Sequence, residues 1–143
     1  MKNQAKLFLA PFVLFFLILS TQSLLAQRTP PRFYSEECEE IEDPQERQIC
    51  AGQAMLELLY KNVEYPPQAK AEGIEGTVVI SIKIDEAGIV YETTISHDIG
   101  MGCGDAAQAV VEDYLYAWVP ATEDGEPIPF NGMRIPVKFA LHY

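Results

Sequence analysis

A strict alternation of apolar and polar side chains over residues 77–84 is the feature that most constrains the fold. Its apolar members fall on one face of an extended strand: Val78, Ile80, Ile82 and Ile84. The turn sequence Asp-Glu-Ala-Gly follows at residues 85–88, and its glycine can adopt a positive φ. We expect a second strand after this turn, with one face formed by Ile89, Tyr91, Thr93 and Ile95. The pattern therefore predicts a β-hairpin.

Two helices are predicted around this hairpin. The first begins at Asp43, because an Asp N-cap, Pro44 in the first turn and Glu46 three residues after the cap form a start signal. Its apolar face is expected to carry Met55, Leu56, Leu59, Tyr60 and Val63. The second helix follows the glycine-rich segment at residues 100–104 and has Asp105 as its expected N-cap. Its apolar face is expected to carry Ala107, Val110, Val111, Tyr114 and Leu115.

A third strand is predicted at the end of the sequence. Its apolar residues are Ile135, Val137, Phe139 and Leu141, which alternate with Arg134, Lys138 and His142. Pro136 cannot donate to a ladder, so we place this strand at a sheet edge. The predicted fold class is α+β, a small three-stranded antiparallel sheet with helices packed on one face. We expect one core formed by Val78, Ile80, Ile82, Val111, Trp118, Val137 and Phe139.

The first 26 residues have the layout of a secretory signal peptide. Lys2 and Lys6 precede an apolar run over residues 7–19, and a polar patch leads to an expected cleavage after Ala26. The alternative is a membrane anchor, but that run makes only about 20 Å of helix against a hydrocarbon core of about 30 Å. The predicted division is a signal peptide over residues 1–26, an irregular acidic segment over 27–51 and a folded domain over 52–143.

The charge of the chain excludes some partners. The formal net charge is −11, and the leader contains no acidic residue, so its removal makes the charge more negative. Nucleic acids and anionic membrane surfaces would be repelled. We therefore expect no nucleic-acid partner.

Three cysteines allow three pairings in a compartment where thiols oxidise. We expect a disulfide between Cys38 and Cys50, which would close a short loop. Cys103 is then left over, as a small buried thiol, a partner for one of the other two, or a reactive thiol beside a helix. A zinc site built from the cysteines with His97 or His142 is not favoured, because the usual ligand spacings are absent.

Motifs for catalysis are lacking. The sequence contains no nucleophile elbow, no zinc-protease motif and no phosphate-binding lysine loop. The glycines at 100, 102 and 104 resemble a phosphate loop only weakly, because Asp105 stands where an anion would bind. We expect no enzyme activity, no cofactor and no metal.

An ordered set of short motifs resembles one known family. The motifs are Tyr65-Pro66, Ala69, residues 73–80 (Gly-Ile-Glu-Gly-Thr-Val-Val-Ile), Asp85 to Gly88, Trp118-Val-Pro and Pro136-Val-Lys-Phe. Their order and spacing over about residues 54–141 resemble the C-terminal domain of TonB energy transducers. The chain is most similar to short Bacteroidetes-type members, which can also carry an upstream Cys pair and the Ile-Gly-x-Gly-Cys-Gly loop found at residues 99–104.

The resemblance implies a periplasmic protein that binds the TonB box, an extended segment of outer-membrane transporters. The peptide would add itself to the exposed last strand, where backbone groups are unpaired. The implied partner-binding residues are Asn131, Met133, Arg134, Ile135, Val137, Lys138 and Phe139. The alternative is an edge that Pro136 and the basic side chains protect from pairing, in a structural or regulatory envelope domain.

Two departures from full TonB proteins bear on this expectation. The long Pro-rich spacer is reduced to Thr29-Pro-Pro-Arg, and a cleaved leader would leave no membrane helix to contact the inner-membrane motor proteins. A retained leader would instead anchor the protein in the inner membrane. An open edge strand would also allow a domain-swapped homodimer.

Overall fold

The computed structural model describes residues 26–141, so residues 1–25 of the predicted signal peptide and His142 lie outside the described residues. No helix within residues 26–141 is long and apolar enough to cross a membrane. The chain forms these elements in order: β1 (Arg28–Thr29), β2 (Arg32–Phe33), α2 (Glu36–Glu39), α3 (Pro44–Asn62), α4 (Pro67–Ala71), β3 (Gly76–Ile84), β4 (Val90–His97), α5 (Cys103–Tyr114), β5 (Trp118–Val119), β6 (Ala121–Glu123), β7 (Glu126–Ile128) and β8 (Phe130–Phe139).

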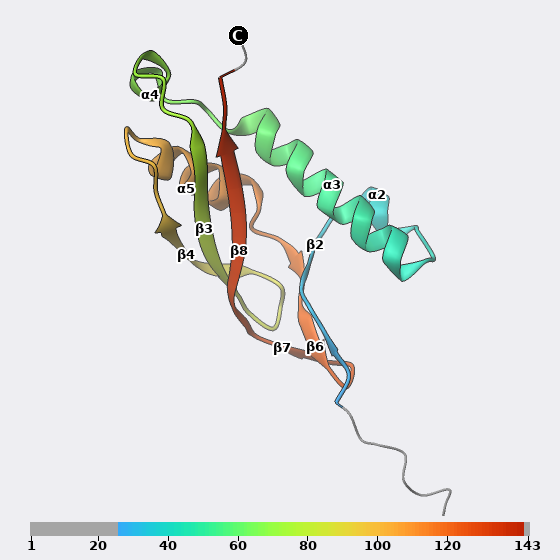
Figure 1. The fold of residues 1–143 in the computed structure, drawn as a ribbon. Helices are drawn as coiled ribbons and strands as arrows, with labels where there is room; N and C mark the ends of the chain where they lie inside the picture. The colour runs from blue at the N-terminus through green and yellow to red at the C-terminus, as the bar shows by residue number, and fades with distance from the viewer. Residues whose placement is uncertain (1–25, 142–143) are drawn as a thin grey trace, which may run out of the picture.

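The main sheet has the strand order β4-β3-β8, with both pairings antiparallel (Figure 1). This confirms the predicted α+β fold with a three-stranded antiparallel sheet. Two small sheets were not predicted: β1 pairs with β6, which pairs with β7, and β2 pairs with β5. These pairings attach the N-terminal residues of the described chain to its last third.

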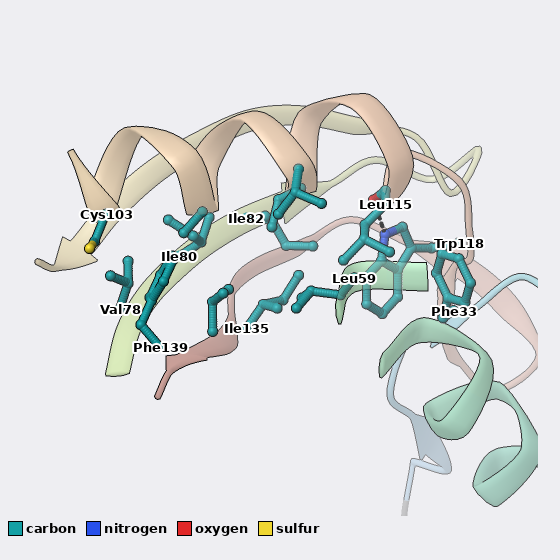
Figure 2. Close-up of a cluster of buried hydrophobic side chains, with 14 of the residues drawn as sticks. Phe33, Leu59, Val78, Ile80, Ile82, Cys103, Leu115, Trp118, Ile135 and Phe139 are labelled. Carbon is teal, nitrogen blue, oxygen red and sulfur yellow. Dashed lines mark hydrogen bonds between the residues drawn. The ribbon is translucent and has the colours of Figure 1, made fainter. Parts of the chain in front are cut away.

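One hydrophobic core lies between the sheet and its helices. The alternating residues of β3 are buried, and α5 packs across their face of the sheet (Figure 2). Leu59 of α3 and Ala69 of α4 join the same cluster. The outer side chains of β8 are exposed, so the helices of residues 26–141 cover one face of the sheet. The predicted core is confirmed in every member: Val78, Ile80, Ile82, Val111, Trp118, Val137 and Phe139 are buried together.

The hairpin between β3 and β4 forms where it was predicted. The Asp85 carboxylate accepts hydrogen bonds from the Ala87 and Ile89 amides, which closes the turn. Gly88 has φ +80°, and a Cβ there would lie 1.9 Å from the Trp118 carbonyl oxygen. Only glycine fits this position, because both its backbone angle and its neighbour exclude a side chain.

The predicted face of β4 was partly wrong. Val90 pairs with Ile84 and Glu92 pairs with Lys83, so Tyr91 is an extra residue in the ladder, a β-bulge. The bulge changes the alternation: Val90 packs against the core, whereas Ile89 and Tyr91 are exposed. A bulge is decided by how two strands meet, and period-2 counting along one strand cannot detect it.

Helix α3 begins as predicted, because the Asp43 side chain accepts hydrogen bonds from the Gln45 and Glu46 amides. Of its expected apolar face, however, Leu56 and Tyr60 are exposed. The segment over residues 27–51, expected to be irregular, contains β1, β2, α2 and the first turns of α3. The expected boundary after Ala51 therefore lies inside a helix.

Helix α5 begins two residues before the predicted cap, with Gly102 at the N-cap in a left-handed conformation. Asp105 lies in the first turn instead. A Cβ on Gly104 would lie 2.7 Å from an Asp98 carboxylate oxygen, so this glycine allows the acid to sit against the helix start. An acid at this end suits the helix dipole. Tyr114, expected on the buried face, is exposed.

The predicted disulfide between Cys38 and Cys50 is present and joins α2 to α3. Cys103 is buried and unpaired. Burial, together with the Asp98 carboxylate, raises the pKa of the Cys103 thiol. A raised pKa keeps the thiol protonated, which argues for the small buried thiol and against the reactive one.

Replacing Phe139 with alanine should lower the free energy of unfolding by about 3–5 kcal/mol, because it leaves a cavity in the core. Phe139 is buried and its ring meets Tyr65 edge to face, with centroids 5.2 Å apart. Urea unfolding measures the loss. Lys138→Ala is the matched control, since that neighbouring side chain is exposed. A loss below about 1 kcal/mol for Phe139→Ala would contradict its place in the core.

Replacing Cys38 and Cys50 together with serine should cost about 2–4 kcal/mol of unfolding free energy, the amount expected for opening a short loop. The two cysteines are 12 residues apart in sequence. Non-reducing peptide mapping should recover both in one linked fragment, with Cys103 free. A fragment linking Cys103 to either of them would contradict the pairing.

Candidate partner-binding edge

Strand β8 lies at the edge of the main sheet, and within residues 26–141 it pairs with β3 alone. The register is regular from Arg134, opposite Ser81, to Phe139, opposite Gly76. In an antiparallel pair, alternate residues direct their amide and carbonyl groups away from the partner strand. The open side of β8 therefore presents backbone groups from every second residue.

The amide of Lys138 shows which β8 residues direct their backbone groups to the open side. It donates a 3.3 Å hydrogen bond to the Tyr60 hydroxyl of α3 and so points away from β3. By the period of two, Arg134 and Pro136 direct their backbone groups to the same side. Pro136 thus removes a donor from the open edge and leaves the ladder with β3 intact.

The side chains of the predicted site divide between the two faces of the sheet. Ile135, Val137 and Phe139 are buried in the core, and Met133 packs against it. The side chains of Arg134 and Lys138 are exposed on the opposite face. The predicted residues thus lie along one strand, but they form no single side-chain surface.

A β-bulge separates Asn131 from the rest of the predicted site. Met133 pairs with Ile82 and Asn131 with Lys83, which leaves Gly132 as the extra residue, with φ +85°. The Asn131 side chain accepts a 2.9 Å hydrogen bond from the Tyr91 hydroxyl of β4. The regular open edge therefore begins after the bulge.

Helix α3 lies beside the open edge of β8, a neighbour that the sequence did not indicate (Figure 1). The α3 side chain that bonds to the β8 backbone is that of Tyr60, which is 48% exposed. Helical spacing had placed Tyr60 on the apolar face. No local signal could show that its hydroxyl would meet an amide 78 residues further along the chain.

The exposed face of β8 is basic in an acidic protein. Among the residues that the structure describes, Arg134 and Lys138 take part in none of the ion pairs, which join Arg28 to Glu123, Arg32 to Glu39 and Lys83 to Glu92. These two cations lie on one exposed strand face in a chain whose net charge is −11. They would attract an acidic partner.

The described part of the chain shows no alternative centre for metal binding. Within residues 26–141 no group of three or more His, Cys, Asp or Glu side chains is placed to hold a metal ion. His97 lies at the end of β4 and is exposed.

Comparison with known proteins places the chain in a family. Residues 61–141 match the family model described as the Gram-negative bacterial TonB protein C-terminal. No curated protein matches the chain. The similar solved structures include two NMR solution structures of the Helicobacter pylori TonB C-terminal domain. The one of its residues 194–285 has 20% identity and a TM-score of 0.45, and covers 62% of this chain and 90% of that one. The structure of its residues 179–285 has 18% identity and a TM-score of 0.48, and the match covers 77% of this chain and 96% of that one. Because the family model spans more than half of the 143 residues, the chain belongs to the TonB C-terminal domain family.

Proposed function

We propose that this protein works in the periplasm and binds an extended segment of outer-membrane TonB-dependent transporters, the TonB box, by strand addition to β8. The observation that supports the proposal is the open edge of β8, whose regular register runs from Arg134 to Phe139. Family membership supports a role in the envelope. The proposed role in transport is one of binding and not of catalysis.

Strand addition would use the outward backbone groups of three residues. Arg134 can donate and accept, Pro136 can only accept, and the Lys138 amide now bonds to Tyr60. An incoming strand that extends to Lys138 must replace the Tyr60 hydroxyl at that amide. The exchange replaces one hydrogen bond with another and moves the Tyr60 side chain away from the edge.

In this proposal, the first residues of the described chain serve only as part of the folded domain. The short Thr-Pro-Pro-Arg remnant of the family's spacer lies at residues 29–32, which contribute to β1 and β2 and pair with β6 and β5. We therefore assign peptide binding to this domain. The signal peptide and the release into the periplasm belong to the same proposal.

A second candidate is an envelope domain whose edge avoids pairing. Tyr60 and Pro136 favour it, because each leaves one fewer free donor along the open edge. In that case the domain would keep the family fold without contacting transporters. The two candidates differ in whether the β8 amides respond to peptide.

The variant Arg134→Pro should weaken binding of TonB-box peptides about tenfold, because it deletes an outward donor and adds a ring at the edge. The ladder with β3 should survive, since Pro136 already occupies an equivalent position. Arg134→Ala is the matched control: it removes the same side chain, keeps the amide and should weaken binding less. Titration of the purified protein with peptides from the same organism's transporters, followed by backbone amide shifts, measures both.

Lys138→Pro provides a second test at the other end of the edge, with Lys138→Ala as its control. Thermal unfolding must first show that each proline variant is folded. Equal affinities for folded proline and alanine variants would contradict backbone pairing at β8. If no β8 amide shifts at millimolar peptide, the protected envelope domain becomes the better assignment.

A further inference from the structure

Two hollows lie along the open edge of β8, one near each end of its regular register. The Trp118 pocket has a volume of about 130 Å³, and its lining includes Phe33, Met55, Trp118, Met133 and Ile135. The Tyr65 pocket has a volume of about 470 Å³ and is lined by Tyr60, Val63, Tyr65, Lys138, Phe139 and Ala140. Residues of α3 line both pockets, so both lie where α3 faces the edge strand.

The spacing of the two pockets follows from β8. Ile135 lines the first pocket and Phe139 the second, and both side chains are buried on the core face. Four residues of strand separate them, which is about 13 Å at roughly 3.3 Å per residue. A strand added beside β8 has the same rise and alternation. Its residues opposite Ile135 and Phe139 would therefore face the two pockets.

We propose that the segment bound by β8 is an extended peptide with apolar side chains at positions i and i+4, one for each pocket. This inference rests on the proposed strand addition and adds the sequence pattern of the partner. Backbone pairing alone selects no sequence, whereas two pockets at a fixed spacing do. The intervening position i+2 faces Val137, between the pockets.

The sizes of the pockets favour one apolar side chain in each. A cavity of about 150 Å³ lined by apolar groups accepts a benzene molecule. The Trp118 pocket has a similar volume and a mostly apolar lining, to which Arg32, Gln48 and Arg134 also contribute, so it suits a single leucine or phenylalanine side chain. The Tyr65 pocket is larger and accepts any apolar side chain. Its floor includes Phe139, so a side chain bound there would extend the core of the protein.

The outer face of β8 defines the charge of the partner. The peptide residues opposite Arg134 and Lys138 would lie beside these two side chains, which form no ion pair among residues 26–141. Opposite charges at adjacent cross-strand positions stabilise a sheet. We therefore assign acidic residues to these positions. A second copy of this chain is a poorer occupant, because each copy carries a net charge of −11.

Two synthetic peptides of identical composition test the spacing. Both have blocked ends, a threonine-rich background, two glutamates and two leucines, with the leucines at i and i+4 in one and at i and i+3 in the other. The i+4 peptide should bind the purified protein about tenfold more tightly, because only its leucines share one face of a strand. Amide shifts should report saturable binding at residues 133–135 and 139–140.

A matched pair of variants on α3 tests the Trp118 pocket itself. Gly52 contributes to the lining, and a Cβ added there would meet nothing within 4 Å, so Gly52→Leu adds apolar atoms at the wall of the pocket without a clash at the Cβ. It should remove most of the tenfold preference for the i+4 peptide. Gln53→Leu adds the same side chain on an exposed residue of the same helix and should keep the preference.

The outcomes separate this inference from the proposed function. Equal affinities for the two peptides, with shifts along β8, would overturn the two-pocket pattern and leave strand addition in place. Transporter peptides that shift no β8 amide would overturn both. Shifts of the same amides that grow with protein concentration in the absence of peptide would assign the edge to a second copy and overturn the proposal.

Discussion

The structure depends on β3, which is paired on both sides and buries one whole face. Its partners are β4 and β8, and its inward residues Val78, Ile80, Ile82 and Ile84 are fully excluded from water. At roughly 1.5–3 kcal/mol for each such side chain, this stripe is a major source of stability. A fully paired central strand also leaves two edges, and the two edges of this sheet differ.

The β4 edge is closed at its start by the chain that follows α5. The Val90 amide donates to the Tyr116 carbonyl, the Trp118 amide donates to the Gly88 carbonyl, and Ile89 forms a bridge with Ala117. The β8 edge has no such backbone partner in the described chain, and it faces α3 across two pockets. This difference directs the proposed binding to β8, because an added strand needs both free backbone groups and room beside them.

Local patterns predicted the elements that local physics controls. The alternation of apolar and polar residues predicted β3 and β8. The Asp43 cap predicted the start of α3, and Gly88 predicted the hairpin turn. The errors lie where a distant segment decides the outcome. The bulge at Tyr91 and the bulge at Gly132 depend on how β3 meets its partners, and the small sheets formed by β1 and β2 depend on strands about 90 residues away. The same limit applies to the candidate site, where the basic and apolar residues of β8 were predicted but their neighbours on α3 were not.

The sequence by itself determined the two long helices, the three strands of the main sheet, the centre of the core and the position of the edge strand. Hydrophobic period, capping residues and a proline act within a few residues, so they are visible in one dimension. Tertiary structure decided what the open edge can meet: the Tyr60 hydroxyl at the Lys138 amide and the two hollows between α3 and β8. The physical reason for both features is packing, because the position of a helix depends on the side chains that it buries. Leu59 of α3 is buried in the core, and the next residue, Tyr60, therefore lies beside β8.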